Sequence, residues 1–114
     1  MTEQEYIASL RENFCDGNEP TAEVVTMVNQ AVGAFPGCAE LWLLHAQVSL
    51  CATDDDGPHP EVVRSFERAL SCDENFLPAL DALAVYWDSV RDDPTRAEVY
   101  FDRATAVRER SRVQ

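Results

Sequence analysis

The feature of this sequence that most constrains its fold is a trio of apolar or small residues that occurs three times with one spacing. The trios are Val24/Val28/Ala31, Val62/Phe66/Ala69 and Ala97/Phe101/Ala104. Offsets of i, i+4 and i+7 place all three side chains on one face of an α-helix. The last residues of successive trios are 38 and 35 residues apart. A period of this length predicts stacked helical repeats.

The segments between these trios contain a second set of helically spaced residues. Its members are Ile7/Leu10/Phe14, Trp42/His45/Ser49 and Leu80/Leu83/Trp87. Each repeat therefore contains two helices, and three repeats cover residues 4–38, 39–76 and 77–111. One pair of helices cannot bury its own apolar face, so stability comes from the stacking of neighbouring pairs. We expect one all-α domain over residues 1–114, built from six helices in three antiparallel pairs.

Local signals predict where the helices begin and end. Thr2 with Glu5 matches a capping box, and Pro36-Gly37 ends the second helix. Asp93-Pro94 combines a capping residue with a first-turn proline. Further predicted starts are Pro20 or Thr21, Pro60, and Asn75 as the N-cap of the fifth helix. No segment alternates with period two, so we expect no strand.

The pattern of large, small and aromatic residues resembles the tetratricopeptide repeat (TPR) family over nearly the whole chain. The matching residues are Trp42 and Ala46; Leu80, Leu83, Ala84 and Trp87; Phe66 with Ala69; Phe101 with Ala104; and Pro36. The sequence departs from the family pattern at Arg11, His45 and Ser49, and half-TPR repeats remain a close alternative. The resemblance implies a right-handed superhelix.

Two kinds of residue are expected to hold such a superhelix together. Small residues let helix backbones approach closely, and these are Ala46, Ala69, Ala84 and Ala104. Aromatic residues fill the gaps between layers, each contributing roughly 2–3 kcal/mol on burial; these are Trp42, Phe66, Trp87 and Phe101.

The charge of the chain excludes some classes of partner. The 21 acidic and nine basic residues give a net charge of −12, and every basic residue is an arginine. Nucleic acids and anionic membrane surfaces both require a basic face, so we expect neither as a partner. Met1 to Leu10 has no secretory signal, and no run could span a membrane, so a cytoplasmic protein is expected. The acidity either serves a basic partner or reflects genome composition or salt adaptation.

The sequence offers little for catalysis or metal binding. His45 falls at a core position and His59 in a loop, and no nucleophile is paired with a base by a known motif. The Asp54–Gly57 run resembles a calcium loop, but Val63 stands where the final glutamate is required. The four cysteines, at 15, 38, 51 and 72, form no Cys-x-x-Cys pair. We expect free structural thiols, no metal, no cofactor and no enzymatic activity.

The TPR resemblance instead implies a binding groove lined by the first helix of each repeat. The positions that face this groove are Glu5, Ala8, Glu12, Cys15, Asp16, Glu40, Leu43, Gln47, Leu50, Cys51, Pro78, Asp81, Val85, Asp88 and Ser89. Six of these fifteen residues are acidic and none is basic. This composition disfavours the chaperone-tail-binding subfamily, which clamps a C-terminal carboxylate with lysine, arginine and asparagine.

The sequence therefore predicts a scaffold or chaperone-like adaptor that binds a basic or amphipathic protein segment. The expected charge contacts are Glu12, Glu40, Asp81 and Asp88, beside Gln47, with an apolar floor of Leu43, Leu50 and Val85. The alternative function is self-assembly into a homo-oligomer. Tyr100 and Val107 form a stripe on the last helix that a following helix would normally cover, and a second copy is one candidate to cover it.

Overall fold

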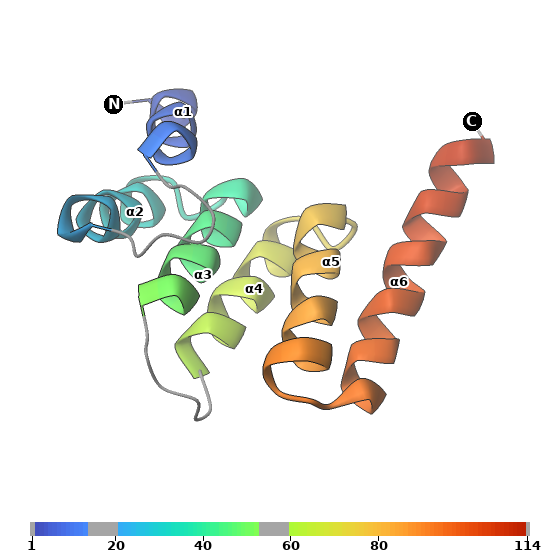
Figure 1. Ribbon diagram of the computed structural model, residues 1–114. Helices are drawn as coiled ribbons and strands as arrows, with labels where there is room; N and C mark the ends of the chain where they lie inside the picture. Colours follow the sequence, from blue (N-terminus) through green and yellow to red (C-terminus); the bar gives the residue numbers. More distant parts are fainter. Residues whose placement is uncertain (1, 14–20, 53–59, 114) are drawn as a thin grey trace.

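The protein is all-helical in the computed structural model, which describes residues 2–13, 21–52 and 60–113 (Figure 1). The helices are α1 (Glu3–Asn13), α2 (Ala22–Ala34), α3 (Ala39–Ala52), α4 (Pro60–Cys72), α5 (Leu77–Val85) and α6 (Pro94–Val113), and a π-helix, η1 (Tyr86–Val90), continues α5. The predicted all-α class with six α-helices is confirmed, and the described ranges contain no strand. The handedness of a superhelix remains a prediction.

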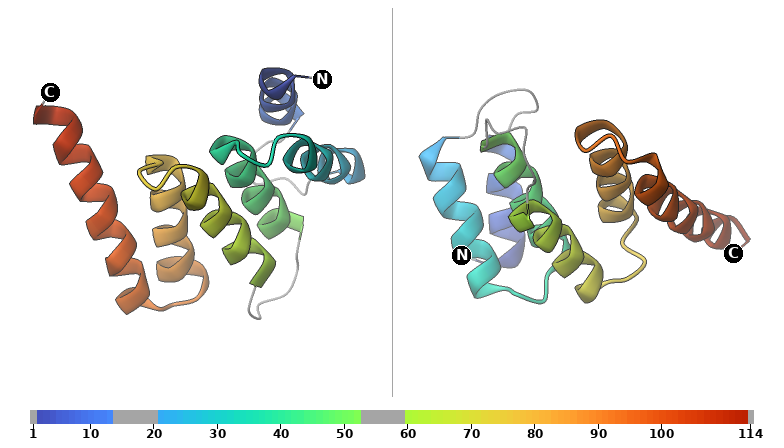
Figure 2. Two further views of the ribbon diagram at one scale, coloured as in Figure 1. Left: turned by 180° about the vertical axis from the view of Figure 1, so that it is seen from behind. Right: turned by 90° about the horizontal axis from the view of Figure 1, so that it is seen from below.

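Helices that follow one another in sequence also pack against one another. The contacts are most extensive between α3 and α4 and between α5 and α6, and α1 rests on both α2 and α3. Figures 1 and 2 show α3 to α6 side by side in one row, with α2 at the end next to α3, α6 at the other end, and α1 lying over α2 and α3. The helix pairs α1/α2, α3/α4 and α5/α6 fall close to the three repeat ranges. The arrangement is therefore repeat-like.

Several predicted helix starts are confirmed by their hydrogen bonds. The Glu5 carboxylate accepts from the Thr2 backbone N–H at 3.1 Å, and the Thr2 hydroxyl accepts from the Glu5 N–H at 3.2 Å. The first of these bonds holds the pKa of the Glu5 carboxyl below its usual value, because it stabilises the charged form. Thr21 Oγ1 accepts from Val24 N–H, and Asp93 Oδ1 accepts from Arg96 N–H, each at 3.2 Å.

The prediction that Asn75 caps the fifth helix is wrong. The N-cap of α5 is Phe76, which has no side chain able to accept a hydrogen bond. The Asn75 N–H instead binds the Asp73 carboxylate at 3.1 Å. This local turn uses the tendency of aspartate to bond the backbone two residues ahead, and it shifts the helix start by one residue.

The core consists of two clusters that share one tryptophan. The first cluster joins α1, α2 and α3 through Ile7, Leu10, Val24, Val28, Ala31, Val32, Leu41, Leu44 and Val48. The second joins α3 to α6 through Leu43, Ala46, Val62, Phe66, Ala69, Leu70, Ala79, Leu80, Leu83, Tyr86 and Ala104. Trp42 packs against both. All four predicted small residues, Ala46, Ala69, Ala84 and Ala104, are fully buried.

The predicted interlayer aromatics differ in their burial. Phe66 is only 2% exposed, and Trp42 and Trp87 are half-buried. The prediction is wrong for Phe101, which is 40% exposed because no described helix packs on that side of α6. Tyr100 and Val107, the stripe that a following helix would normally cover, are half-buried against the second cluster and so stay partly exposed. α6 therefore packs against the second cluster through Tyr100, Ala104 and Val107, and Phe101 lies on its exposed side, which we call the open flank of α6.

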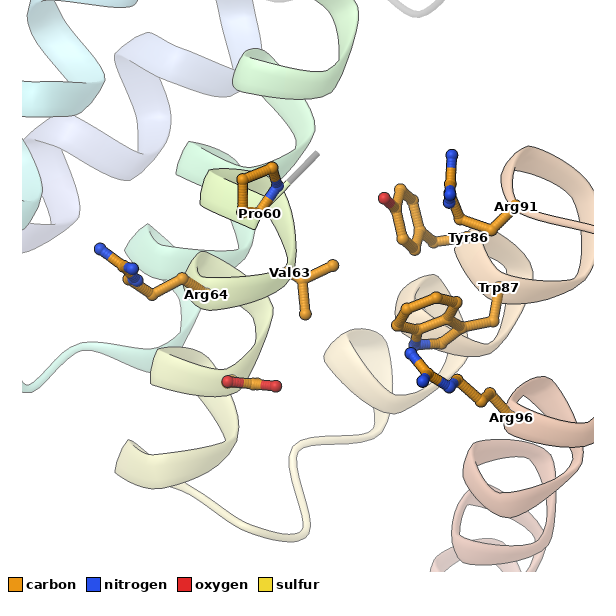
Figure 3. Close-up of a pocket in the computed structure, with 8 residues that line it drawn as sticks. Pro60, Val63, Arg64, Tyr86, Trp87, Arg91 and Arg96 are labelled. Atoms are coloured by element: carbon orange, nitrogen blue, oxygen red, sulfur yellow. The ribbon is translucent and has the colours of Figure 1, made fainter. Parts of the chain in front are cut away.

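α5 ends in a π-helix, which the sequence analysis did not predict. The Arg91 N–H donates to the Tyr86 carbonyl, five residues back, at 3.1 Å, and the Asp93 N–H donates to the Trp87 carbonyl at 2.7 Å. Asp92 then takes φ = 52°, a left-handed conformation that aspartate tolerates better than most residues. This widened turn reverses the chain and places two aromatic residues, Tyr86 and Trp87, opposite α4 (Figure 3).

Candidate interaction surface

Three of the predicted charge contacts and apolar floor residues lie on α5 and on the π-helix that continues it. Asp81 and Val85 are one turn apart on α5, and Asp88 follows three residues later in η1; we call these three residues the outward face of α5. The Val85 side chain is 52% exposed, Asp88 is exposed and Asp81 is half-buried. The opposite side of α5 is buried in the core. An apolar side chain is therefore presented between two carboxylates.

Asp81 already has a basic partner within the chain. Its carboxylate forms an ion pair with the Arg108 guanidinium on α6. Phe101 lies two turns before Arg108 on α6 and is exposed. Exposed ion pairs contribute only about 0–1 kcal/mol, because water screens them. Breaking this ion pair would therefore cost the fold little.

The α3 residues of the predicted groove are less accessible. Glu40 is half-buried and forms an ion pair with Arg11 on α1. Leu43 is buried in the second core cluster, and Leu50 is partly buried against it. Gln47 is half-buried. The expectation that Leu43 forms an apolar floor fails, because α3 is covered by α2 on one side and by α4 on the other.

The predicted groove residues of α1 are exposed but spread out. Glu12 and Ala8 are exposed, and Glu5 is committed to the capping box at the helix start. Cys15 and Asp16 lie outside the described residues, as do His59 and the Asp54–Gly57 run. Among the four expected charge contacts, two are paired internally (Glu40 and Asp81) and two lie exposed (Glu12 and Asp88). The available negative charge is thus smaller than the sequence alone indicates.

His45 is a hydrogen-bonded core residue, as expected. Its Nδ1 lies 2.7 Å from Ser65 Oγ and its Nε2 lies 2.8 Å from Asn29 Oδ1, so it bridges α2, α3 and α4. Burial lowers the pKa of the imidazole, which favours the neutral form. The single proton of the Ser65 hydroxyl is donated to the Glu61 carbonyl, so the hydroxyl oxygen is the group that Nδ1 contacts. One ring thus satisfies polar groups on two neighbouring helices.

The contact between His45 and Ser65 has the geometry of a base beside a nucleophile, and the sequence analysis missed it because the two residues lie on different helices. Ser65 is buried, however, and its Oγ also lies 2.9 Å from the Glu61 carbonyl of its own helix. A serine held within a helix and covered by packing is closed to a substrate. The arrangement accounts for a buried polar group and supports no reaction.

A pocket of about 660 Å³ lies between α4 and the π-helix, away from the outward face of α5 (Figure 3). It is lined by Pro60, Val63, Arg64, Glu67, Tyr86, Trp87, Arg91 and Arg96. None of these was predicted as a site residue. The one sequence signal that pointed here is the uneven charge: residues 1–63 contain a single arginine, and residues 64–114 contain eight.

The described residues show no other site for chemistry. No three histidine, cysteine or carboxylate side chains among them converge so as to hold a metal ion. Cys38, Cys51 and Cys72 form no disulfide, and burial raises the pKa of the Cys38 thiol. Cys51 and Cys72 are exposed rather than packed as small apolar residues. Among the helices of the described ranges, none has the length and apolar character that crossing a membrane requires.

Comparisons with protein-family models, with curated proteins and with solved structures gave no match to this chain. The surface of the chain itself is therefore the basis on which its function is inferred.

Proposed function

We propose that the chain is a protein-binding module of TPR-like helical repeats, acting as a scaffold or adaptor for a basic or amphipathic segment. The observation that carries this proposal is the outward face of α5, where an exposed Val85 lies between Asp81 and Asp88. An amphipathic helix binds through an apolar residue with charges on either side. Lysine or arginine residues of the partner would pair with Asp88 and exchange with Arg108 at Asp81.

This surface can be tested with a matched pair of double variants. Val85→Lys/Asp88→Lys changes the proposed face, whereas Val99→Lys/Asp102→Lys makes the same change in charge with the same spacing on α6. Val99 is 55% exposed and Asp102 is exposed, so neither pair disturbs the core. We expect the first variant to weaken binding of a lysine- and leucine-rich amphipathic peptide by about tenfold or more, equivalent to about 1.4 kcal/mol.

The measurement is fluorescence anisotropy of the labelled peptide, at low salt and at high salt. The α6 variant should bind within about a factor of two of the unchanged protein, since scattered surface charges contribute little. An equal loss in both variants would show that net charge alone attracts the peptide. A peptide array without preference for basic sequences would contradict the proposal.

Self-assembly is a second candidate function, and one observation favours it. Phe101 occupies the position in α6 that Phe66 occupies in α4, yet Phe66 is covered by α5 and Phe101 is 40% exposed. A second copy packed on this flank would bury the ring as α5 buries Phe66. We expect light scattering to detect dimers or larger species, and Phe101→Ser to return them to monomers. A monomer at low and at high salt would exclude this function.

A further inference from the structure

The pocket between α4 and the π-helix, which we call the Arg–Trp pocket, differs in character from the rest of the surface. It is lined by Pro60, Val63, Arg64, Glu67, Tyr86, Trp87, Arg91 and Arg96. In Figure 3 the rings of Tyr86 and Trp87 face Val63, with Arg96 next to the indole and Arg91 next to Tyr86. Its volume of about 660 Å³ lies within the range of small-molecule sites. The pocket thus combines an apolar wall, formed by Val63, Tyr86 and Trp87, with arginine side chains.

The charge of the Arg–Trp pocket is opposite to that of the whole protein. Three of the nine arginines line it and Glu67 is the one acidic residue among its lining, although the chain carries a net charge of −12. Asp93 lies 3.5 Å from Arg96 and offsets part of that charge. Positive charge collected beside a low-dielectric aromatic wall attracts anions. The ligand class that this pocket favours is therefore anionic.

The indole nitrogen of Trp87 supplies an independent observation. Its Nε1–H is buried and has no hydrogen-bond acceptor among the described residues. The Arg96 guanidinium lies over the same ring, 4.7 Å from its centroid, but guanidinium nitrogens only donate. The indole donor therefore lacks an acceptor, whereas the guanidinium next to it is paired with Asp93. A buried donor left unsatisfied is unfavourable, so a ligand oxygen that accepts from it gains more than it would at the open surface.

The other tryptophan shows that this situation is specific to Trp87. Trp42 also lies beneath an arginine, Arg68, whose guanidinium is 5.9 Å from the ring centroid. Its Nε1–H, however, donates to the Pro36 carbonyl at 2.8 Å. The chain thus contains two Arg–Trp pairs, one complete within the fold and one lacking an acceptor. The incomplete pair is the one that lines a pocket.

We propose that the Arg–Trp pocket binds an oxyanion, carboxylate or phosphate, carried on an aromatic or apolar group. The oxyanion accepts from the Arg96 guanidinium and, once this exposed side chain shifts, from Trp87 Nε1–H. Arginine suits either anion because its planar donors match two oxygens at once. The apolar group of the ligand packs between Val63 and the rings of Tyr86 and Trp87. The π-helix that positions these two rings is a local irregularity of a kind frequent at functional sites.

Nuclear magnetic resonance of the two indole N–H groups tests this proposal directly. The probes are phenyl phosphate and phenylacetate, with inorganic phosphate and benzylamine as controls. We expect either anionic probe to shift the Trp87 indole signal in a saturable way and to leave the Trp42 signal nearly unchanged, because its N–H is already bonded. A response to phenyl phosphate alone assigns a phosphate ligand, and a response to phenylacetate alone assigns a carboxylate.

Two matched variants connect the shift to the pocket. Arg96→Gln should weaken binding by about tenfold or more, because it removes the charged donor next to the indole. Arg68→Gln, at the complete pair, should change the affinity by less than about a factor of two. Both positions are exposed, so both variants should fold.

Several outcomes would overturn the proposal. One is the absence of a saturable Trp87 shift at about 10 mM of either anionic probe, which is about ten times a millimolar Kd. Others are equal binding of benzylamine, an equal loss in both variants, or equal affinity for inorganic phosphate and phenyl phosphate, which would remove the role of the apolar wall. Binding at the Arg–Trp pocket is tested independently of peptide binding at α5, because Val85→Lys/Asp88→Lys changes no pocket-lining residue.

Discussion

Replacing Phe66 by alanine should lower the free energy of unfolding by about 3–5 kcal/mol. The Phe66 ring is 2% exposed, lies in the cluster that joins α3 to α6, and sits with its centroid 6.4 Å from that of Tyr86. Its removal leaves a cavity at the junction of three helices, which cannot close without moving a whole helix. Because small domains are stable by only about 5–15 kcal/mol, this loss is a large share of the total. Urea unfolding followed by circular dichroism measures it.

The matched control is Phe101→Ala, which makes the same change 35 residues later in the chain. Phe101 is 40% exposed, so we expect a loss of about 1 kcal/mol or less. The difference in the free energy of unfolding between the two variants then measures how much stability the burial of Phe66 under α5 contributes. Similar losses at both positions would contradict the open flank of α6 described above.

Much of the fold was predictable because it depends on local spacing. The recurring trios predicted which face of α2 and α4 turns inward, and all six of their residues are buried. On α6 the trio was right for Ala97 and Ala104 but wrong for Phe101. Helix starts at Thr2, Thr21 and Asp93 were predictable because each side chain bonds a backbone N–H three residues ahead. These features involve a few neighbouring residues, and their geometry is set before any long-range contact forms.

The remaining features depend on contacts between distant segments. A periodic pattern shows which face of a helix is apolar but not how many neighbours cover it. Leu43 is buried because α3 has helices on both sides, and Phe101 is exposed because α6 lies at the end of the row. The pairs Arg11–Glu40 and Arg108–Asp81 likewise join different helices, so the acidic residues looked more available in the sequence than they are.

The Arg–Trp pocket was not predictable for a related reason. Its lining comes from α4, from the π-helix, from Arg91 directly after it and from the first turn of α6, and no short motif connects them. The π-helix adds one residue to a turn, and its first two residues, Tyr86 and Trp87, both pack in the second cluster. The family pattern assigned this role to Trp87 alone. A one-residue change in helical register of this kind leaves no clear trace in a single sequence.

Replacing Trp42 by alanine should have the second largest effect, a loss of about 2–4 kcal/mol in the free energy of unfolding. Trp42 packs against both core clusters, and its indole N–H donates to the Pro36 carbonyl at 2.8 Å. Trp42→Phe keeps most of the apolar contact but removes the donor. We expect this variant to lose about 0.5–1.5 kcal/mol, the contribution of a single hydrogen bond. Urea unfolding of the three proteins side by side gives both values.

The same substitution should also change how the chain unfolds. Repeat-like stacks are held together by contacts between neighbours, so weakening one junction lets the two sides unfold separately. In Trp42→Ala we expect the amide hydrogens of α1 and α2 to exchange before those of α4 to α6, because the first cluster joins fewer helices. In the unchanged protein the core amides should exchange together. Uniform exchange in Trp42→Ala would show that contacts other than Trp42, such as the polar bridge from Asn29 through His45 to Ser65, couple the two clusters.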